Sequence, residues 1–148
     1  MTARSGDRLN ITSGKDNAFN GSHSSIERPD LISSDIYGPG KTASDLKPGD
    51  QILNYFNRAA FAQAAPGTLG NAMRDIAVGP AFWQINLAVS RLLPVGTRQV
   101  ELRLEAFNVL NHFNWGDPAT NFNSGSFGRI TTQTGDPRIL QLGLKYAF

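Results

Sequence analysis

The stretch FWQINLAVSRLLPVGTRQVELRLEAF, residues 82–107, decides the fold, because two alternating segments flank a short turn in it. In 82–93 apolar side chains recur at every second position from Trp83 to Val89, and in 98–106 they recur from Val100 to Ala106. A period of two is that of a β-strand with one apolar face. PVGT at 94–97 predicts a tight turn, which makes the two strands antiparallel neighbours.

The end of the chain, RILQLGLKYAF, predicts a third strand over 138–148. Its alternation continues to the last residue, Phe148, whereas chain ends are usually polar and poorly ordered. Chain order and the short connection predict a meander with 98–108 in the middle. The alternation changes phase after Ala106, which predicts a bulge or the end of the strand near Asn108.

Residues 14–81 are rich in Ser, Asn, Asp, Gly and Pro and show little periodicity, which predicts an irregular loop region. Within it, apolar spacing favours at most a short helix near 50–57 and no strand of eight or more residues between 20 and 48. Residues 1–13 are interpreted as the end of a preceding strand. The expected organisation is therefore 1–13, then 14–81, then three strands within 82–148.

Strand parity predicts which side chains share a face of the sheet. The apolar face is expected to carry Trp83, Ile85, Leu87, Val89, Val100, Leu102, Leu104, Leu140, Leu142, Leu144 and Phe148. The opposite face is expected to carry Gln84, Asn86, Glu101, Arg103, Glu105, Gln141 and Lys145. The apolar face has no obvious second layer to cover it, so we expect it to be exposed or covered by the long loop.

Alternation alone is typical of a soluble antiparallel sheet, but three details favour a transmembrane β-barrel. The strands have about 9–11 alternating residues, whereas soluble strands have about 5–6. Charged residues lie in the middle of 98–106, as a water-filled lumen permits. Aromatic residues lie at strand ends, as in interfacial girdles, for which we select Trp83, Tyr146 and Phe148. The fold expected is all-β, an antiparallel meander of long amphipathic strands from the end of such a barrel.

Connection lengths then set an orientation, because outer-membrane barrels have short periplasmic turns and long external loops. The turn at 94–97 is periplasmic in this arrangement, and residues 14–81 and 109–137 are external.

Four pieces in order carry a resemblance to a known family: FNRAAF (56–61), GPAFWQINLAVSR (79–91), RLEAFNVLNHFNW (103–115) and GDPRILQLGLKYAF (135–148). They resemble the C-terminal barrel of TonB-dependent outer-membrane receptors, most closely the Oar-like group with a carboxypeptidase-regulatory-like domain. The resemblance covers about residues 54–148, and TARSGDRLNITSG near the start resembles the end of an earlier strand.

The resemblance implies a location in the outer membrane of a Gram-negative cell and a part in transport. It implies that Phe148, Tyr146 and Leu144 form the signal that the barrel-assembly machinery recognises. The implied partners are outer-membrane lipid, that machinery, the rest of the parent barrel and, through it, TonB. Such barrels have about 22 strands and a plug, whereas these residues contain neither, nor a secretory leader. We therefore expect a fragment that does not transport alone.

Other chemistry has little support in the sequence. The absence of cysteine excludes disulfides and thiolate sites, and scattered basic residues argue against nucleic-acid binding. His23 beside serines lacks a nucleophile elbow, KDNAFNG (15–21) lacks the acidic spacing of a calcium loop, and Gly67 and Gly70 are turn glycines. The sequons at Asn10 and Asn20 carry no functional inference. We expect no enzyme activity, no cofactor and no metal; the alternative function is a small soluble antiparallel β-protein that acts as a binding module.

Overall fold

A computed structural model describes residues 1–21, 27–42, 47 and 49–147. The chain divides into two compact units. We call the first the sheet unit, formed by Met1–Arg4, Phe82–Asn114 and Thr134–Phe148. The second is the loop unit, formed by Ser5–Ala81 and Trp115–Gln133.

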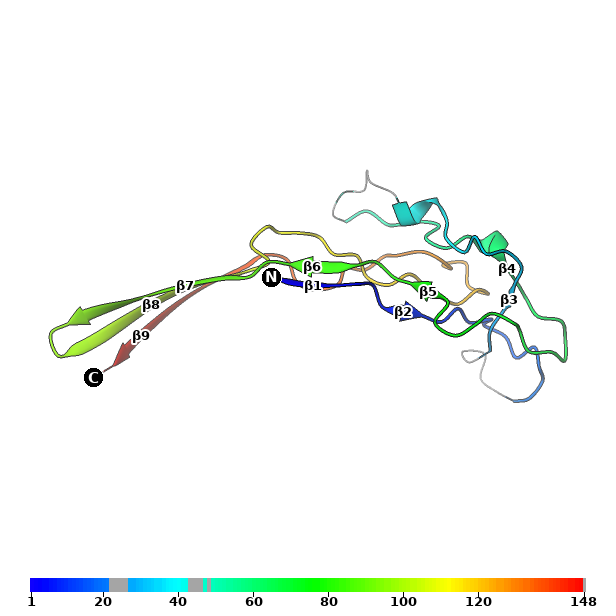
Figure 1. The fold of residues 1–148 in the computed structure, drawn as a ribbon, viewed down its shortest axis with the longest axis horizontal. Helices are drawn as coiled ribbons and strands as arrows, with labels where there is room; N and C mark the ends of the chain where they lie inside the picture. Colours follow the sequence, from blue (N-terminus) through cyan, green and yellow to red (C-terminus); the bar gives the residue numbers. More distant parts are fainter. Residues whose placement is uncertain (22–26, 43–46, 48, 148) are drawn as a thin grey trace. The chain divides into compact units, whose positions relative to one another are not determined.

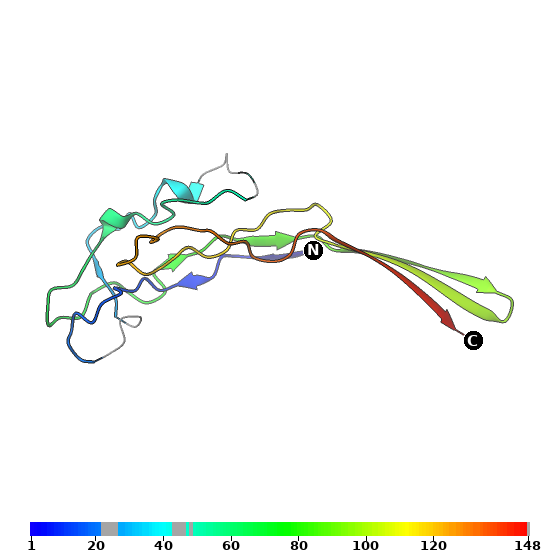
Figure 2. The same ribbon diagram turned by 180° about the vertical axis from the view of Figure 1, so that it is seen from behind.

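The sheet unit contains one antiparallel sheet in the order β7–β8–β9 (Figure 1). Its strands are β7 (Leu87–Val95), β8 (Arg98–Phe107) and β9 (Ile139–Ala147). The expected meander with 98–108 in the middle is confirmed. The view from behind shows the same side-by-side arrangement, with the end of β9 lying towards the β7–β8 turn (Figure 2).

The first predicted strand, 82–93, is wrong in its bounds. It is divided into β6 (Phe82–Gln84) and β7, because β6 pairs with β1 (Thr2–Arg4) and β7 pairs with β8. β7 also continues to Val95, so the turn contains only Gly96 and Thr97. Pro94 stays in the strand because its fixed φ is compatible with extended backbone. Gly96 has φ +64°, a conformation favoured by glycine at the first position of a two-residue hairpin turn.

β8 ends at Phe107, as the phase change at that point predicted. Asn108 follows with φ +49°, a left-handed conformation that asparagine adopts more readily than most residues. Its backbone N–H donates to the side-chain oxygen of Asn86 at 3.0 Å, which closes the ladder between the two strands.

The loop unit has little regular structure. β2 (Arg8–Leu9) pairs with β5 (Ala77–Val78), and β3 (Asp30–Leu31) pairs with β4 (Phe61–Ala62). At the β2–β5 ladder, Gly6 and Gly79 approach so closely that a Cβ at Gly6 would collide with the Gly79 carbonyl. In the described part of 20–48 the longest strand has two residues, so the expected absence of a long strand is confirmed there.

No helix forms at 50–57, which agrees with the expectation of at most a short one there. These residues form isolated bridges instead, Ile52 with Ile130 and Phe56 with Tyr37. The helical turns are η1 (Pro39–Thr42) and η2 (Arg58–Ala60), and Asn57 caps η2 by accepting from the Ala59 N–H. The apolar spacing in 50–63 arises because an irregular chain places these side chains in a core, so tertiary contacts outweigh helix periodicity.

The loop unit has a hydrophobic core, whereas an irregular loop region was expected. It is formed by Ile11, Ile36, Ile52, Tyr55, Phe56, Ala60, Phe61, Ala77, Phe127 and Ile130. Phe56 lies 5.5 Å from Phe127 between ring centroids, and Phe61 meets Phe127 edge to face at 5.8 Å. Residues 5–81 and 115–133 thus share one aromatic core although they are far apart in sequence.

Among the described residues, no helix is long and apolar enough to cross a membrane.

Candidate functional site

The β7–β8–β9 sheet separates its side chains by chemistry, and its register fixes which residues share a face. Val89 is opposite Leu104, which is opposite Leu142 on the third strand. Directly opposed residues in antiparallel strands point to the same side. One face therefore carries Leu87, Val89, Leu93, Val95, Val100, Leu102, Leu104, Ala106, Leu140, Leu142, Leu144 and Tyr146, together with Arg91 and Arg98.

The predicted apolar face is confirmed for the residues within this sheet. Trp83 lies in β6 and Ile85 lies between β6 and β7, so neither belongs to the three-stranded register. Phe148 lies outside the described residues. Leu142 is 78% exposed and Leu144 is 70% exposed, which matches the expectation that no second layer covers this face.

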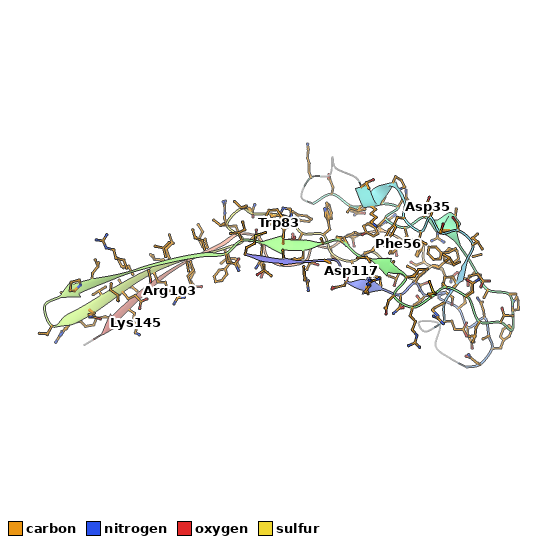
Figure 3. All side chains as sticks on the ribbon, in the orientation of Figure 1. Asp35, Phe56, Trp83, Arg103, Asp117 and Lys145 are labelled. Atoms are coloured by element: carbon orange, nitrogen blue, oxygen red, sulfur yellow. The ribbon has the colours of Figure 1, made fainter. Side chains whose placement is uncertain are left out.

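The opposite face is polar at its centre. It carries Glu101, Arg103, Glu105, Gln141 and Lys145, as parity predicted, with Leu92, Phe107 and Ile139 toward the strand ends. The Arg103 guanidinium lies 2.8 Å from the Glu105 carboxylate along the same strand. Lys145 on β9 is directly opposite Glu101 on β8, and Figure 3 shows Arg103 and Lys145 on these two neighbouring strands. The face thus presents mixed charge, which suits contact with water.

Tyr146 and Leu144 lie near the end of β9, on the apolar face. The Tyr146 hydroxyl accepts a hydrogen bond from Arg98 Nη1 at 2.6 Å, and the guanidinium carbon lies 5.7 Å from the ring centroid. The register places Tyr146 opposite Val100, near the two-residue turn. An aromatic ring and a cation therefore lie together at this edge of the apolar face.

Trp83 lies on β6, a different strand from Tyr146. Its ring stacks on His112 with centroids 3.8 Å apart and an interplanar angle of 24°. Its backbone N–H and C=O both bond to the side-chain amide of Asn114, at 2.9 and 3.0 Å. Asn114 thus takes the place of a strand residue beside Trp83.

Asparagines after β8 form a network that the sequence reasoning missed. The Asn108 side chain is 1% exposed, donates to the carbonyls of His112 and Asp136, and accepts from the His112 N–H. The Asn111 side chain accepts from the Arg138 N–H at 3.0 Å. The sequence did carry a signal for this network, since Asn108, Asn111 and Asn114 are spaced three apart at the end of an alternating strand. Asparagine amides bond to backbone groups, and asparagine tolerates positive φ.

The residues considered for other chemistry do not gather into a site. His112 stacks on Trp83, whereas His23 lies outside the described residues. The Asp16 carboxylate accepts from the Asn20 and Gly21 N–H groups within its own turn. Gly67 has φ +81° in a turn, and Gly70 lies against the backbone of Arg28 and Pro29. In the part of the chain that the structure describes, no group of three or more His, Asp or Glu residues could hold a metal.

The loop unit is held by polar contacts as well as by its core. The Arg58 guanidinium donates to the carbonyls of Phe122 and Ser124 and lies 5.2 Å from the Phe122 ring centroid. The Tyr55 hydroxyl donates to the Val78 carbonyl at 3.0 Å. Burial, with smaller effects from Tyr37 and Asp117, raises the pKa of Tyr55 from 10.0 to about 12.

A sheet with long strands, one exposed apolar face and one charged face is what a transmembrane barrel wall requires. A family model described as "Outer membrane beta barrel domain" matches residues 1–141. The chain belongs to this family. Its location is the outer membrane, and its all-β antiparallel sheet is barrel structure. No curated protein and no solved structure gives a significant match to the chain.

In an outer membrane beta barrel domain the apolar face of each strand contacts lipid and the other face lines the lumen. β8 has ten residues. At about 3.4 Å per residue and a tilt of about 45°, it rises about 24 Å, close to the roughly 25 Å apolar band of such barrels. Its length is therefore sufficient for one crossing.

Proposed function

We propose that this chain forms part of the barrel of a TonB-dependent outer-membrane receptor of the Oar-like group, which imports a solute. The observation that carries the proposal is the division of β7–β9 into an apolar and a charged face, together with a separately packed loop unit. The pieces that resemble this group also have structural roles. FNRAAF supplies core residues Phe56 and Phe61, and RLEAFNVLNHFNW supplies the asparagine network.

The proposed orientation places the two-residue turn at Gly96 and Thr97 on the periplasmic side. Outer-membrane barrels have short periplasmic turns and long external loops. Of the two segments that form the loop unit, Ser5–Ala81 precedes β6 and β7, and Trp115–Gln133 lies between β8 and β9, so both join the strands at the ends away from this turn. The loop unit is then external, where a rigid aromatic core would hold a solute-contacting surface in place.

The barrel must contain more strands than β7, β8 and β9. In the described structure the outer edges of β7 and β9 have no strand along most of their length. Unpaired backbone groups are too costly in lipid, so a spanning sheet has to close. We propose that further strands of the parent barrel fill these edges, and that the sheet of this chain does not transport by itself.

Two roles for individual residues complete the proposal. Phe148, Tyr146 and Leu144 form the terminal signal that the barrel-assembly machinery binds. Trp83, Tyr146 and Phe148 contribute to aromatic girdles, because amphipathic rings favour the membrane interface. Neither catalysis nor a cofactor belongs to this function; TonB, the assembly machinery and outer-membrane lipid are its partners.

The orientation is tested by labelling single cysteines in intact cells, which is clean because the chain has no native cysteine. The variants are Thr97→Cys in the turn and Leu69→Cys, an exposed position of the loop unit. A membrane-impermeant maleimide should label only Leu69→Cys in intact cells, and both after the outer membrane is opened. Labelling of Thr97→Cys in intact cells would show that the orientation is reversed.

The receptor assignment has a separate test. The protein that carries these residues is isolated from outer membranes and cross-linked in cells that produce TonB. A cross-link to TonB and energy-dependent uptake of a solute are expected. An outer-membrane product that neither cross-links to TonB nor depends on the energised inner membrane would refute this assignment while leaving the barrel fold intact.

A further inference from the structure

We propose that the charged face of β8 and β9 holds a binding site for a zwitterionic solute, the ammonium and carboxylate head group of an α-amino acid. The site is a depression of about 250 Å³ at Gly143 in β9, lined by Glu101, Arg103, Gly143, Leu144 and Lys145. The register places the three charged side chains of this set on the polar face, around Gly143. The inference rests on the proposed import function and deepens it, because a solute that passes through the lumen would meet this face.

Gly143 is a residue whose lack of a side chain the backbone does not require. Its φ is not positive, and the ladder passes through it without a bulge, with Arg103 directly opposite. Among the described atoms, those nearest to an added Cβ would be the Arg103 Cβ at 3.7 Å and carbonyl oxygen at 3.8 Å, which are ordinary contact distances. Glycine weakens the interior of a strand and often marks a place where a ligand approaches closely. We therefore attribute the glycine to space for a solute.

Arg103 is positioned to bind a carboxylate beside Gly143. Its Nη2 lies 2.8 Å from Glu105 Oε1, which anchors one side of the guanidinium. Arginine has further N–H donors in a fixed fork, and this fork binds carboxylates in a bidentate manner. Both strand neighbours opposite Arg103 are small, Ser90 on β7 and Gly143 on β9. A solute can therefore reach the guanidinium from the lumen.

The charges of this face fit a zwitterion better than a simple ion. On the described strands the face carries the acids Glu101 and Glu105 and the bases Arg103 and Lys145. A plain anion would be repelled by the carboxylates, and a plain cation by the basic groups. Lys145 is directly opposite Glu101, yet within the part of the chain that the structure describes the two side chains do not form an ion pair. A solute that carries both charges can pair with each of them.

The spacing of the ladder places complementary groups around Gly143. Arg103 is opposite Gly143, with about 5 Å between Cβ positions, and Lys145 lies two positions along β9, about 7 Å away. A carboxylate over Gly143 can accept hydrogen bonds from both side chains. Glu101 is on the diagonal, at about 7–8 Å, where it can accept from the ammonium group of the same solute. The head group of an amino acid thus spans the depression from Gly143 to Glu101.

The test uses the full 148-residue chain in nonionic maltoside micelles, with isotope-labelled arginine for nuclear magnetic resonance. The Nε–H signal of Arg103 is identified by its loss in Arg103→Lys. L-alanine is titrated in, and a saturable shift of this signal is expected. Acetate, which lacks the ammonium group, and methylammonium, which lacks the carboxylate, should each bind about threefold more weakly than L-alanine.

Gly143→Val is the most informative variant, because it fills the depression with a residue that suits a strand and removes no charge. It should abolish the shift. Ala88→Val is the matched control, since it adds bulk to the same face of β7 away from the site and should leave binding unchanged. Lys145→Gln and Glu101→Gln should each weaken binding about threefold, whereas Arg91→Gln on the apolar face should not. Circular dichroism verifies that each variant keeps the β-structure of wild type.

The proposal is overturned if wild type shows no saturable shift, if Gly143→Val binds as wild type does, or if Ala88→Val loses as much binding as Gly143→Val. Acetate that binds as tightly as L-alanine would refute a site for a zwitterion. The measurement involves neither TonB nor membrane orientation. Intact binding without a cross-link to TonB would therefore refute the receptor assignment alone, and a cross-link without binding would refute this site alone.

Discussion

Single residues in the sheet unit show how side-chain chemistry matches the surroundings of each face. Leu142 is 78% exposed and lies among other exposed apolar side chains, and a contiguous exposed apolar patch marks a contact surface. Asn108 shows the opposite case, since it is almost fully buried and every polar atom of its side chain has a partner. Contact with lipid explains why Leu142 is exposed, and hydrogen bonds to backbone groups explain why Asn108 can be buried.

Leu142→Arg should cost about 2–4 kcal/mol of barrel stability, because the side chain faces lipid near the middle of the strand. Leu142→Ala should cost much less than the 2–5 kcal/mol of a buried leucine. Urea unfolding of the parent barrel in vesicles measures both, with Gln141→Arg on the lumen face as a control near wild type. A large loss in Leu142→Ala would mean that this face is covered by protein.

Asn108→Ala should destabilise the end of β8, because it leaves the His112 and Asp136 carbonyls without their donor. An unsatisfied buried polar group costs about 1–3 kcal/mol. Asn108→Gly relieves the positive φ but restores no hydrogen bond, so it should remain destabilised. Melting temperatures of wild type, Asn108→Ala and Asn108→Gly test this prediction. A wild-type melting temperature for Asn108→Gly would show that backbone strain, not the lost hydrogen bonds, determines the stability at this position.

At the scale of elements, local chemistry sets where each strand ends. β7 and β8 meet at a two-residue turn that contains Gly96, and β8 ends where Asn108 enters the left-handed region. β6 is separated from β7 although the alternation continues through both. That break is caused by pairing with β1 and by the Asn114 amide, not by the residues of the strand itself.

Gly96→Val should slow assembly and cost about 1–2 kcal/mol, because a branched side chain is strained at φ +64°. Gly96→Asn should be milder, since asparagine enters this region more readily. Refolding rates into vesicles compare the two with wild type. If valine and asparagine behave alike, the turn has another backbone conformation in the membrane.

At the scale of the whole molecule, the chain contains two units with different stabilising forces. The sheet unit exposes its apolar face, whereas the described part of the loop unit buries ten apolar residues in one core, Phe56 and Phe127 among them. The loop unit is therefore not an unstructured tether. Its core should make the loop unit melt cooperatively.

Phe56→Ala should cost the loop unit about 3–5 kcal/mol, because Phe56 is 2% exposed and contacts three other rings. Hydrogen exchange should rise across the loop unit while β7, β8 and β9 stay protected. Phe19→Ala is the matched control, since Phe19 is 74% exposed. Loss of protection in the sheet strands as well would show that the two units unfold together.

The loop unit should lose stability between about pH 10 and pH 12. The pKa of Tyr55 is about 12 in the folded chain against an ordinary value of 10.0, so in this window the unfolded chain releases the proton and the folded chain keeps it. Stability is complete below pH 10 and falls by about 2–3 kcal/mol as pH rises to 12. Tyr55→Phe loses the hydrogen bond to Val78 but should show a flatter pH profile of hydrogen exchange. An unchanged slope in this variant would assign the effect to other groups.

The sequence alone determined the long strands and their faces, because an alternation of period two leaves only one way to place apolar residues on one side. It also located the end of β8, since a phase change cannot continue in the same strand. From these local patterns followed the meander, the exposed apolar face and the charged lumen face. Lipid favours apolar side chains at outward positions, which produces the strong pattern; Arg91 and Arg98 are exceptions on this face.

Only the tertiary structure decided how residues 5–81 and 115–133 are arranged. Their apolar residues have no period, because an irregular chain reaches its core through turns rather than through a repeating geometry. Tyr55, Phe56 and Ile52 therefore resembled a helix, although they pack against Phe127 and Ile130 from a distant segment. The roles of Asn108, Asn114 and Arg58 depend on backbone groups up to 66 positions away, and contacts between such distant positions exist only once the chain has folded.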